Sequence, residues 1–181
     1  MSNKTKVILD CNMFDFFMKN KIDPISEANQ RSLPIEFGIT LLIKQEVERA
    51  YPTKTELRNF CEALLPRLTI FSPKPVFGFG SNNSNFDNAG FSDGRLEQIT
   101  GLAAAHPTHG ADLLHMGISA DVNGYLATQE KAMAVEPARQ SPNLKLISFW
   151  KSGGEPIGAH DWLEYLMSKI KELETKTGDR Q

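Results

Sequence analysis

Residues 7–13 read Val7-Ile8-Leu9-Asp10-Cys11-Asn12-Met13, and this stretch decides the expected fold. Residues 6–9, of which the last three are apolar, favour a short buried strand, which ends at Asp10. The dense aromatic and apolar cluster at residues 13–18 then favours a helix. A buried strand that leads directly into a helix is the repeating unit of an α/β domain with a parallel sheet.

The same alternation of strand and helix continues along the chain. Further strands are expected at residues 34–40, 68–71, 125–128 and 145–149. Helical spacing of apolar residues predicts helices at residues 41–50, 57–65, 95–105, 111–120 and 162–173. Pro52 is expected to end the first of these helices, and residues 53–56 have the form of a capping box before the second. The expected fold class is therefore α/β, with a central, mainly parallel sheet covered by helices.

The length of 181 residues fits a single domain, 1–181, because domains usually contain roughly 100 to 200 residues. Residues 72–108 interrupt the periodic pattern, begin with a stretch rich in Gly, Asn, Ser and Phe, and are expected to be an insertion within this domain. The insertion could be a structural or partner-binding loop, or it could offer nucleobases a stacking surface. Its phenylalanines are Phe77, Phe79, Phe86 and Phe91. The charged tail at residues 175–181 is expected to fray.

The composition is typical of a folded, water-soluble protein, with 40% hydrophobic and 23% charged residues. No apolar stretch approaches the roughly 20 residues that a membrane span requires, and the first residues lack the pattern of a signal peptide. Two cysteines, Cys11 and Cys61, are too few for a disulfide framework or a zinc cluster. We therefore expect a cytoplasmic protein without membrane contact, and the sequence leaves its oligomeric state open, a homodimer included.

The net charge of −2 and the pI of about 6.1 argue against a broad basic surface of the kind that dominates non-specific nucleic-acid binding. A local basic rim around an acidic site would still be compatible with this charge. The residues considered for such a rim are Lys4, Lys6, Lys19, Lys21, Lys44 and Arg49.

Four carboxylates occupy positions that could form one site. Asp10 and Glu130 follow the ends of expected strands, where open parallel sheets bind their ligands. Glu46 lies near the edge of an apolar helical stripe, and Asp112 opens a helix with His115 one turn further on. Taken singly, each residue has a simpler interpretation. Asp10 could be a helix N-cap, and Glu46 a solvated helical residue. Asp112 and Glu130 could be acids in the first turn of a helix, where the helix dipole favours a negative charge, and His115 could be a polar surface residue.

If these acids converge, a divalent cation is implied, because their mutual repulsion would otherwise be costly. Mg²⁺ and Mn²⁺ are the hard cations that suit carboxylate and water ligands. A metal held in this way can activate water for attack on a phosphodiester and stabilise the leaving oxygen. The carboxylate pattern therefore favours a hydrolase that acts on phosphodiesters.

The motifs resemble those of the PIN-domain ribonucleases. Residues 7–13 are similar to the family's opening strand with Asp-Thr-Asn and an apolar residue, and residues 43–47 to its helix with the second acid. Residues 112–118 resemble the helix with the third acid, and residues 126–130 the closing strand with Thr-x-Asp. The resemblance implies that Asp10, Glu46 and Asp112 form the acidic core, that Glu130 takes the fourth acidic position, and that Asn12 and Thr128 support them.

This resemblance implies a Mg²⁺- or Mn²⁺-dependent endoribonuclease acting on RNA, and small members of the family are often the toxin of a toxin–antitoxin pair. The chain departs from the pattern in having Cys11 instead of Thr or Ser, Glu130 instead of Asp, and the long insertion. A catalytically weak module that binds RNA or protein is therefore the alternative. A phosphatase of the haloacid dehalogenase type is a weaker one, because Asn12 stands where that family has a second Asp.

Overall fold

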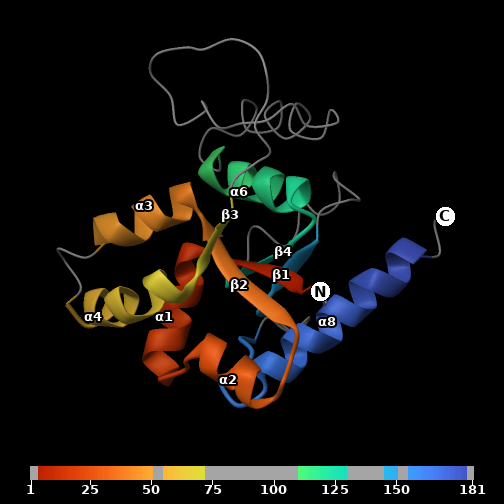
Figure 1. Ribbon diagram of the computed structural model, residues 1–181, viewed down its shortest axis with the longest axis horizontal. Helices are drawn as coiled ribbons and strands as arrows, with labels where there is room; N and C mark the ends of the chain where they lie inside the picture. The colour runs from red at the N-terminus through yellow and green to blue at the C-terminus, as the bar shows by residue number, and fades with distance from the viewer. Residues whose placement is uncertain (1–3, 51–54, 72–109, 130–144, 151–154, 179–181) are drawn as a thin grey trace, which may run out of the picture.

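The computed structural model describes residues 4–50, 55–71, 110–129, 145–150 and 155–178 (Figure 1). The predicted insertion, the helix expected at residues 95–105, Pro52, Thr53 and Glu130 lie outside the described residues. In chain order the elements are β1 (Thr5–Leu9), α1 (Cys11–Asn20), α2 (Pro24–Gln30), β2 (Ile35–Thr40), α3 (Leu41–Ala50), α4 (Thr55–Leu64), the 3₁₀ turn η2 (Leu65–Arg67), β3 (Thr69–Phe71), α6 (Gly110–Asp121), β4 (Tyr125–Thr128), β5 (Leu146–Ser148) and α8 (Trp162–Gly178).

The described strands form a five-stranded sheet in the order β3-β2-β1-β4-β5. All four pairings between neighbouring strands are parallel. This topology confirms the predicted α/β fold and places β1 in the centre of the sheet. Because the strands run in the same direction, their carboxyl ends lie along one edge, which is where parallel sheets bind their ligands.

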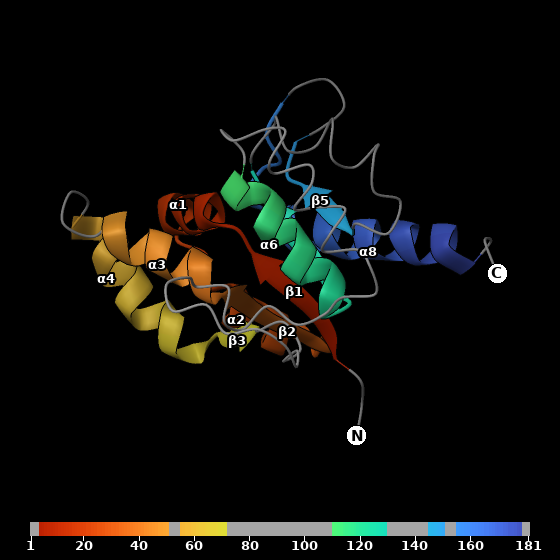
Figure 2. The same ribbon diagram turned by 90° about the horizontal axis from the view of Figure 1, so that it is seen from above.

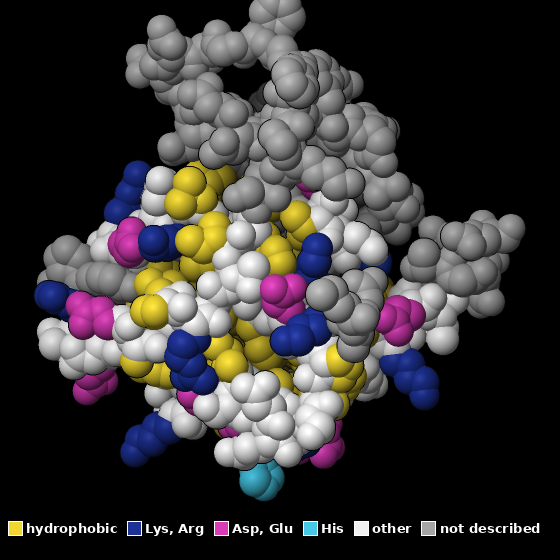
Figure 3. All heavy atoms as spheres, in the orientation of Figure 1, with side chains coloured by type: hydrophobic (Ala, Val, Ile, Leu, Met, Phe, Trp, Pro, Cys, Tyr) yellow, Lys and Arg dark blue, Asp and Glu magenta, His cyan; other side chains and the backbone are white. Residues whose placement is uncertain are grey.

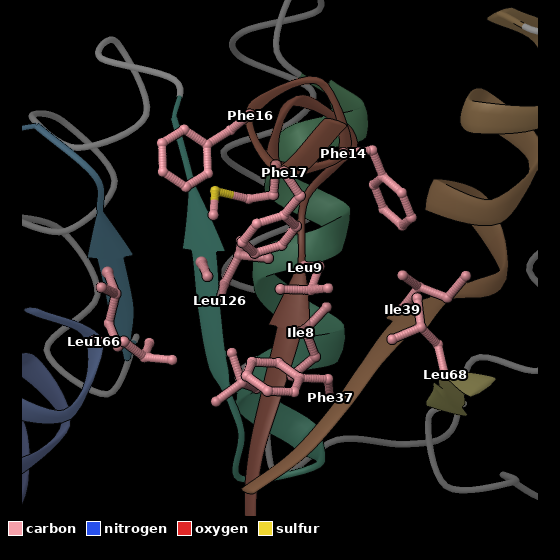
Figure 4. Close-up of a cluster of buried hydrophobic side chains, with 14 of the residues drawn as sticks. Ile8, Leu9, Phe14, Phe16, Phe17, Phe37, Ile39, Leu68, Leu126 and Leu166 are labelled. Atoms are coloured by element: carbon pink, nitrogen blue, oxygen red, sulfur yellow. The ribbon is translucent and has the colours of Figure 1, made fainter. Parts of the chain in front are cut away.

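Helices cover both faces of this sheet. Trp162 of α8 packs against Phe17 of α1 and Phe37 of β2, so α1 and α8 lie on the same face. Figure 4 shows the green helix α6 behind the strands, with Phe17 and Phe37 in front. Burial from both sides explains why the end of β1, residues 7–9, is an uninterrupted apolar run with at most 1% exposure.

Helix α2 was not predicted from the apolar pattern. Asp23 begins it as the N-cap, because its Oδ1 accepts the backbone N–H groups of Ile25 and Ser26, and Pro24 takes the first helical position. Arg67 of η2 donates to both carboxylate oxygens of Asp23, at 2.6 and 3.2 Å. The cap and the ion pair together fix α2 against η2.

Asp23→Ala should therefore lower the free energy of unfolding by about 1 to 2 kcal/mol, because it removes the N-cap of α2. Asp23→Asn should cost less, since asparagine caps a helix as well as aspartate does and an exposed ion pair contributes little. Urea denaturation measures both losses. Equal destabilisation by the two substitutions would contradict the capping role.

The same side chain gives the stability a defined pH dependence. Partial burial alone would raise the pKa of Asp23, but hydrogen bonds from Arg67 and Ser26 and the charge of Arg67 lower it overall. A carboxyl with a lowered pKa in the folded state stabilises the protein above its unfolded pKa of about 4, and this contribution is lost as the pH falls through the folded pKa. The stability difference between wild type and Asp23→Asn should accordingly shrink below about pH 4.

The closing helix α8 runs to Gly178, past the position after Glu174 at which the sequence predicts fraying. At the start of this extension, the Thr175 hydroxyl donates to the Lys171 carbonyl at 3.2 Å. Within the described ranges, no helix has the length and apolar character that crossing a lipid bilayer requires.

Candidate active site

Three polar side chains lie where strands end at the carboxyl edge of the sheet. Asp10 follows β1, Thr40 is the last residue of β2, and Thr128 is the last residue of β4. Asp10 is 2% exposed and the two threonines are fully buried. Because burying a polar group is costly unless it is hydrogen-bonded, the partners of these three residues define the candidate site.

The Asp10 carboxylate is held by two hydrogen bonds. Oδ1 accepts the backbone N–H of Cys11 at 2.7 Å, which makes Asp10 the N-cap of α1. Oδ2 accepts the Thr128 hydroxyl at 2.6 Å, a short bond of the charge-assisted kind. The N-cap interpretation of Asp10 is therefore correct, and the same carboxylate also joins β1 to β4.

Asn12 ties the start of α1 to the end of β4. Its Nδ2 donates to Thr128 Oγ1 at 3.2 Å, and its Oδ1 accepts the backbone N–H of Gln129 at 2.8 Å. Trp150 donates its indole N–H to the Gln129 carbonyl. Asn12 thus supports the Asp10–Thr128 contact, and both backbone polar groups of Gln129 are fixed.

A second set of contacts joins β2, α3 and α6. Thr40 Oγ1 accepts the backbone N–H of Ile43 at 3.2 Å and lies 3.2 Å from His115 Nδ1. The other ring nitrogen of His115, Nε2, lies 3.5 Å from Glu46 Oε2. His115 is fully buried, so its interpretation as a polar surface residue is wrong. It lies between Thr40 and Glu46 instead.

Glu46 faces this edge from α3 with 34% of its side chain exposed. Its pKa is lowered chiefly by the contact with His115, which outweighs the opposing effect of burial. A hydrogen bond from Cys11 and the charge of Arg49 lower this pKa further. Because Cys11 directly follows Asp10, this contact brings Glu46 close to the first acid, and the interpretation of Glu46 as a solvated helical glutamate does not hold.

Asp112 lies on α6 one turn before His115. Helix α6 leads back to the start of β4, so its own beginning lies near the carboxyl edge of the sheet. Figure 2 shows the start of α6 close to α1 and α3, and α3 contacts both helices. The side chain of Asp112 and all of Glu130 lie outside the described residues, so their convergence with Asp10 and Glu46 stays a prediction.

The sequence did not point to Thr40 as a site residue, and it did not predict a contact between Cys11 and an acidic residue. The position of Thr40 in the sequence could have indicated a site residue. Thr40 ends β2 on one side of β1, just as Thr128 ends β4 on the other side. Parallel strands bring such residues to the same edge. The contact of Cys11 with Glu46 had no comparable signal in the sequence.

The basic residues considered for a rim lie on different elements of the described structure. Lys6 reaches the Val122 carbonyl in the turn before β4, near the opposite edge of the sheet, and Lys4 precedes it. Lys19 lies at the far end of α1 from Asp10. Arg49 is the predicted rim residue that acts on Glu46. Figure 3 shows Lys and Arg side chains mixed with Asp and Glu over the described part of one face, without a patch of one sign.

Asp10 fits a hard divalent cation. Its carboxylate is buried, and no Lys or Arg in the described ranges forms an ion pair with it. Buried ionised groups are usually paired with an opposite charge or bound to a metal, and carboxylate oxygens suit Mg²⁺ and Mn²⁺. The described side chains alone contain no group of three or more His, Cys, Asp or Glu that could hold a metal. A complete donor set would therefore need ligands from outside the described side chains, where the predicted acids Asp112 and Glu130 lie.

Comparison with known proteins adds similarity at the level of the fold. No family model and no curated protein matches the chain. Among solved structures, it is similar to VapBC2 from Rickettsia felis bound to a DNA fragment from the promoter, with 18% identity and a TM-score of 0.48, over 81% of this chain and 100% of that chain. It is also similar to VapBC-1 from nontypeable Haemophilus influenzae, with 17% identity and a TM-score of 0.48, over 80% of this chain and 98% of that chain. At these identities the similarity concerns the fold alone.

Proposed function

We propose that the chain is a metal-dependent endoribonuclease that hydrolyses RNA phosphodiester bonds at the carboxyl edge of its sheet. The supporting observation is the buried Asp10 carboxylate, which lies at the end of the central strand with hydrogen bonds to Cys11 and Thr128 but no basic partner among the described residues. Glu46 supplies a second acidic group from α3. The motif resemblance supports Asp112 and Glu130 as the third and fourth acids.

The carboxylates of these four residues would hold Mg²⁺ or Mn²⁺. When bound, such an ion lowers the pKa of water for attack on the phosphorus and stabilises the leaving oxygen. The protein contributes a rigid arrangement of ligands. Thr128 donates to Oδ2 of Asp10 and so fixes the rotation of the carboxylate, and Asn12 holds Thr128 in place from the first turn of α1. Oriented ligands of this kind raise metal affinity.

The proposal is tested by incubating the purified chain with single-stranded RNA and Mn²⁺, then repeating the reaction in excess EDTA. Cleavage should require the metal and should return when Mn²⁺ is restored. The alternative function, a catalytically weak module that binds RNA or protein, is favoured by the mixed charge on the face seen in Figure 3. Such a module would retain its partner in EDTA and would not cleave RNA at any Mn²⁺ concentration.

Glu130→Gln should reduce cleavage less than Asp10→Asn, by about tenfold or less. Glu130 replaces the usual aspartate of the resembled motif, and its longer side chain suits peripheral or water-mediated coordination. Initial cleavage rates at saturating Mn²⁺ measure the difference. A loss as large as that of Asp10→Asn would instead make Glu130 a direct ligand.

The toxin role and an antitoxin partner are part of this proposal through the family resemblance. A neighbouring gene that encodes a small DNA-binding protein would support them, and co-expression of the two chains would test them. The antitoxin should restore growth that the nuclease alone arrests. Size-exclusion chromatography with light scattering would show whether the chain itself forms a homodimer.

A further inference from the structure

His115 is a buried polar residue to which the proposed hydrolysis assigns no step. Its side chain is fully buried, and within the described part of the chain its Nε2 atom has no hydrogen-bond partner of normal geometry. A buried donor or acceptor without such a bond is costly and calls for an explanation. The polar group that the described residues bring to Nε2 is the Glu46 carboxylate, at 3.5 Å.

The contacts of Thr40 and Glu46 together favour one tautomer of the His115 ring. Thr40 Oγ1 accepts the Ile43 N–H, and its hydroxyl can at the same time donate to His115 Nδ1 at 3.2 Å. The proton of a neutral imidazole then resides on Nε2, where it faces Glu46. The opposite tautomer would direct the lone pair of Nε2 at a carboxylate, which is unfavourable. Thr40 therefore anchors the ring, and the ring presents an N–H to Glu46.

We propose that His115 is a positioning residue that holds the Glu46 carboxylate in the orientation required for metal binding. This inference rests on the proposed nuclease function. Glu46 needs such support more than Asp10 does, because its longer side chain is one third exposed, whereas Asp10 is fixed by two hydrogen bonds at a strand end. Groups that orient metal-binding side chains typically change metal affinity by about 10- to 100-fold.

The position of His115 also links two helices of the proposed site. It lies on α6, one turn after Asp112, and its contact with Glu46 joins α6 to α3. The helices that carry the second and third predicted acids are thus linked through a single imidazole. Loss of the Nε2 contact should affect metal binding even when the imidazole pocket is still filled.

Two substitutions separate the two ring nitrogens. His115→Asn keeps an amide near the Nδ1 position, which can still bond to Thr40, but has no group at the Nε2 position. His115→Gln places an amide nitrogen near the Nε2 position and can still donate to Glu46. Calorimetric titration with Mn²⁺ alone, without RNA, should show about tenfold weaker binding by His115→Asn and a clear recovery in His115→Gln.

Ser119→Ala is the matched control, because Ser119 is also buried on α6 but bonds to the Met116 carbonyl of its own helix. Its Mn²⁺ affinity should equal that of wild type. A purely structural role of His115 would lower the melting temperature of both His115 variants without this order of Mn²⁺ affinities. If His115→Asn does not fold, Thr40→Val removes the anchor of the ring while leaving the imidazole, and it should weaken Mn²⁺ binding several-fold.

The decisive test measures the effect of His115→Asn on Mn²⁺ affinity in a chain that already carries Glu46→Gln. His115→Asn should cause no additional loss of Mn²⁺ affinity when Glu46 is already replaced, because the two residues act through one contact. Wild type that binds Mn²⁺, together with a His115→Asn variant that binds it equally tightly, would overturn the positioning role alone. Wild type that binds no Mn²⁺ would overturn both this role and the proposed function.

Discussion

Asp10→Asn should reduce Mn²⁺-dependent cleavage of single-stranded RNA by at least about 100-fold, more than the loss of a supporting residue usually costs. The substitution removes a negative charge from the end of the central strand while keeping nearly the same shape. The amide oxygen that it introduces can still accept one of the two hydrogen bonds that Asp10 accepts from Cys11 and Thr128. Initial rates at saturating Mn²⁺ measure the effect.

Asp23→Asn is the matched control for this experiment. Asp23 is also a helix N-cap, and it lies on the loop before α2, with its contacts to Ser26 and Arg67 rather than to the candidate site. Its cleavage rate should remain that of wild type. The melting temperature of Asp10→Asn without metal should change by a few degrees at most, because one lost hydrogen bond is offset by removal of a buried charge. An Asp10→Asn variant that cleaves RNA as fast as wild type would exclude the proposed metal site.

Much of the fold could be predicted because the sequence pattern and the packing agree. The central strand β1 is buried on both faces and is an uninterrupted apolar run, whereas α3 and α4 carry apolar stripes at helical spacing. Helix α2 was not predicted because its seven residues are too few to show a clear apolar stripe at helical spacing. Its start was nevertheless marked by Asp23-Pro24, an N-cap residue followed by proline at the first helical position.

The candidate site was predictable where its residues follow strands. Asp10 and Thr128 are 118 residues apart in sequence, yet they meet because β1 and β4 are parallel neighbours that end at the same edge. The Thr40–His115–Glu46 contacts were not predictable, since they depend on how α3 and α6 pack across that edge. Helical spacing could place His115 beside Asp112 but could not show that a third element, β2, supplies its partner.

The basic residues considered for a rim are separated for a related physical reason. Residues close in sequence to an acidic residue need not be close to it in space. Lys6 lies towards the other end of β1 from Asp10 and reaches the Val122 carbonyl. Lys19 lies near the far end of α1, about two turns from Cys11. The position of each basic residue along its strand or helix decides whether its side chain lies near the acidic site. Arg49, on the same helix as Glu46 and three residues further on, is the basic residue whose charge reaches that carboxylate.

Glu46→Gln should also reduce Mn²⁺-dependent cleavage by at least about 100-fold, for a reason distinct from that of Asp10→Asn. Glu46 lies on a helix rather than at a strand end, and its carboxylate depends on His115 for its orientation. Its pKa is lowered chiefly by that contact, so the carboxylate stays ionised throughout about pH 6 to 8, and the loss should be the same across this range.

Glu48→Gln is the control for this last substitution, because Glu48 is two residues further along α3 and pairs with Lys44 on the exposed side, at 3.8 Å. A surface ion pair of this kind contributes little, so both stability and cleavage should remain near wild type. If Glu46→Gln and Glu48→Gln cleave RNA equally well, Glu46 has no part in the metal site. If Glu46→Gln alone loses activity but binds Mn²⁺ as wild type does, Glu46 acts on the RNA or on the attacking water rather than on the metal.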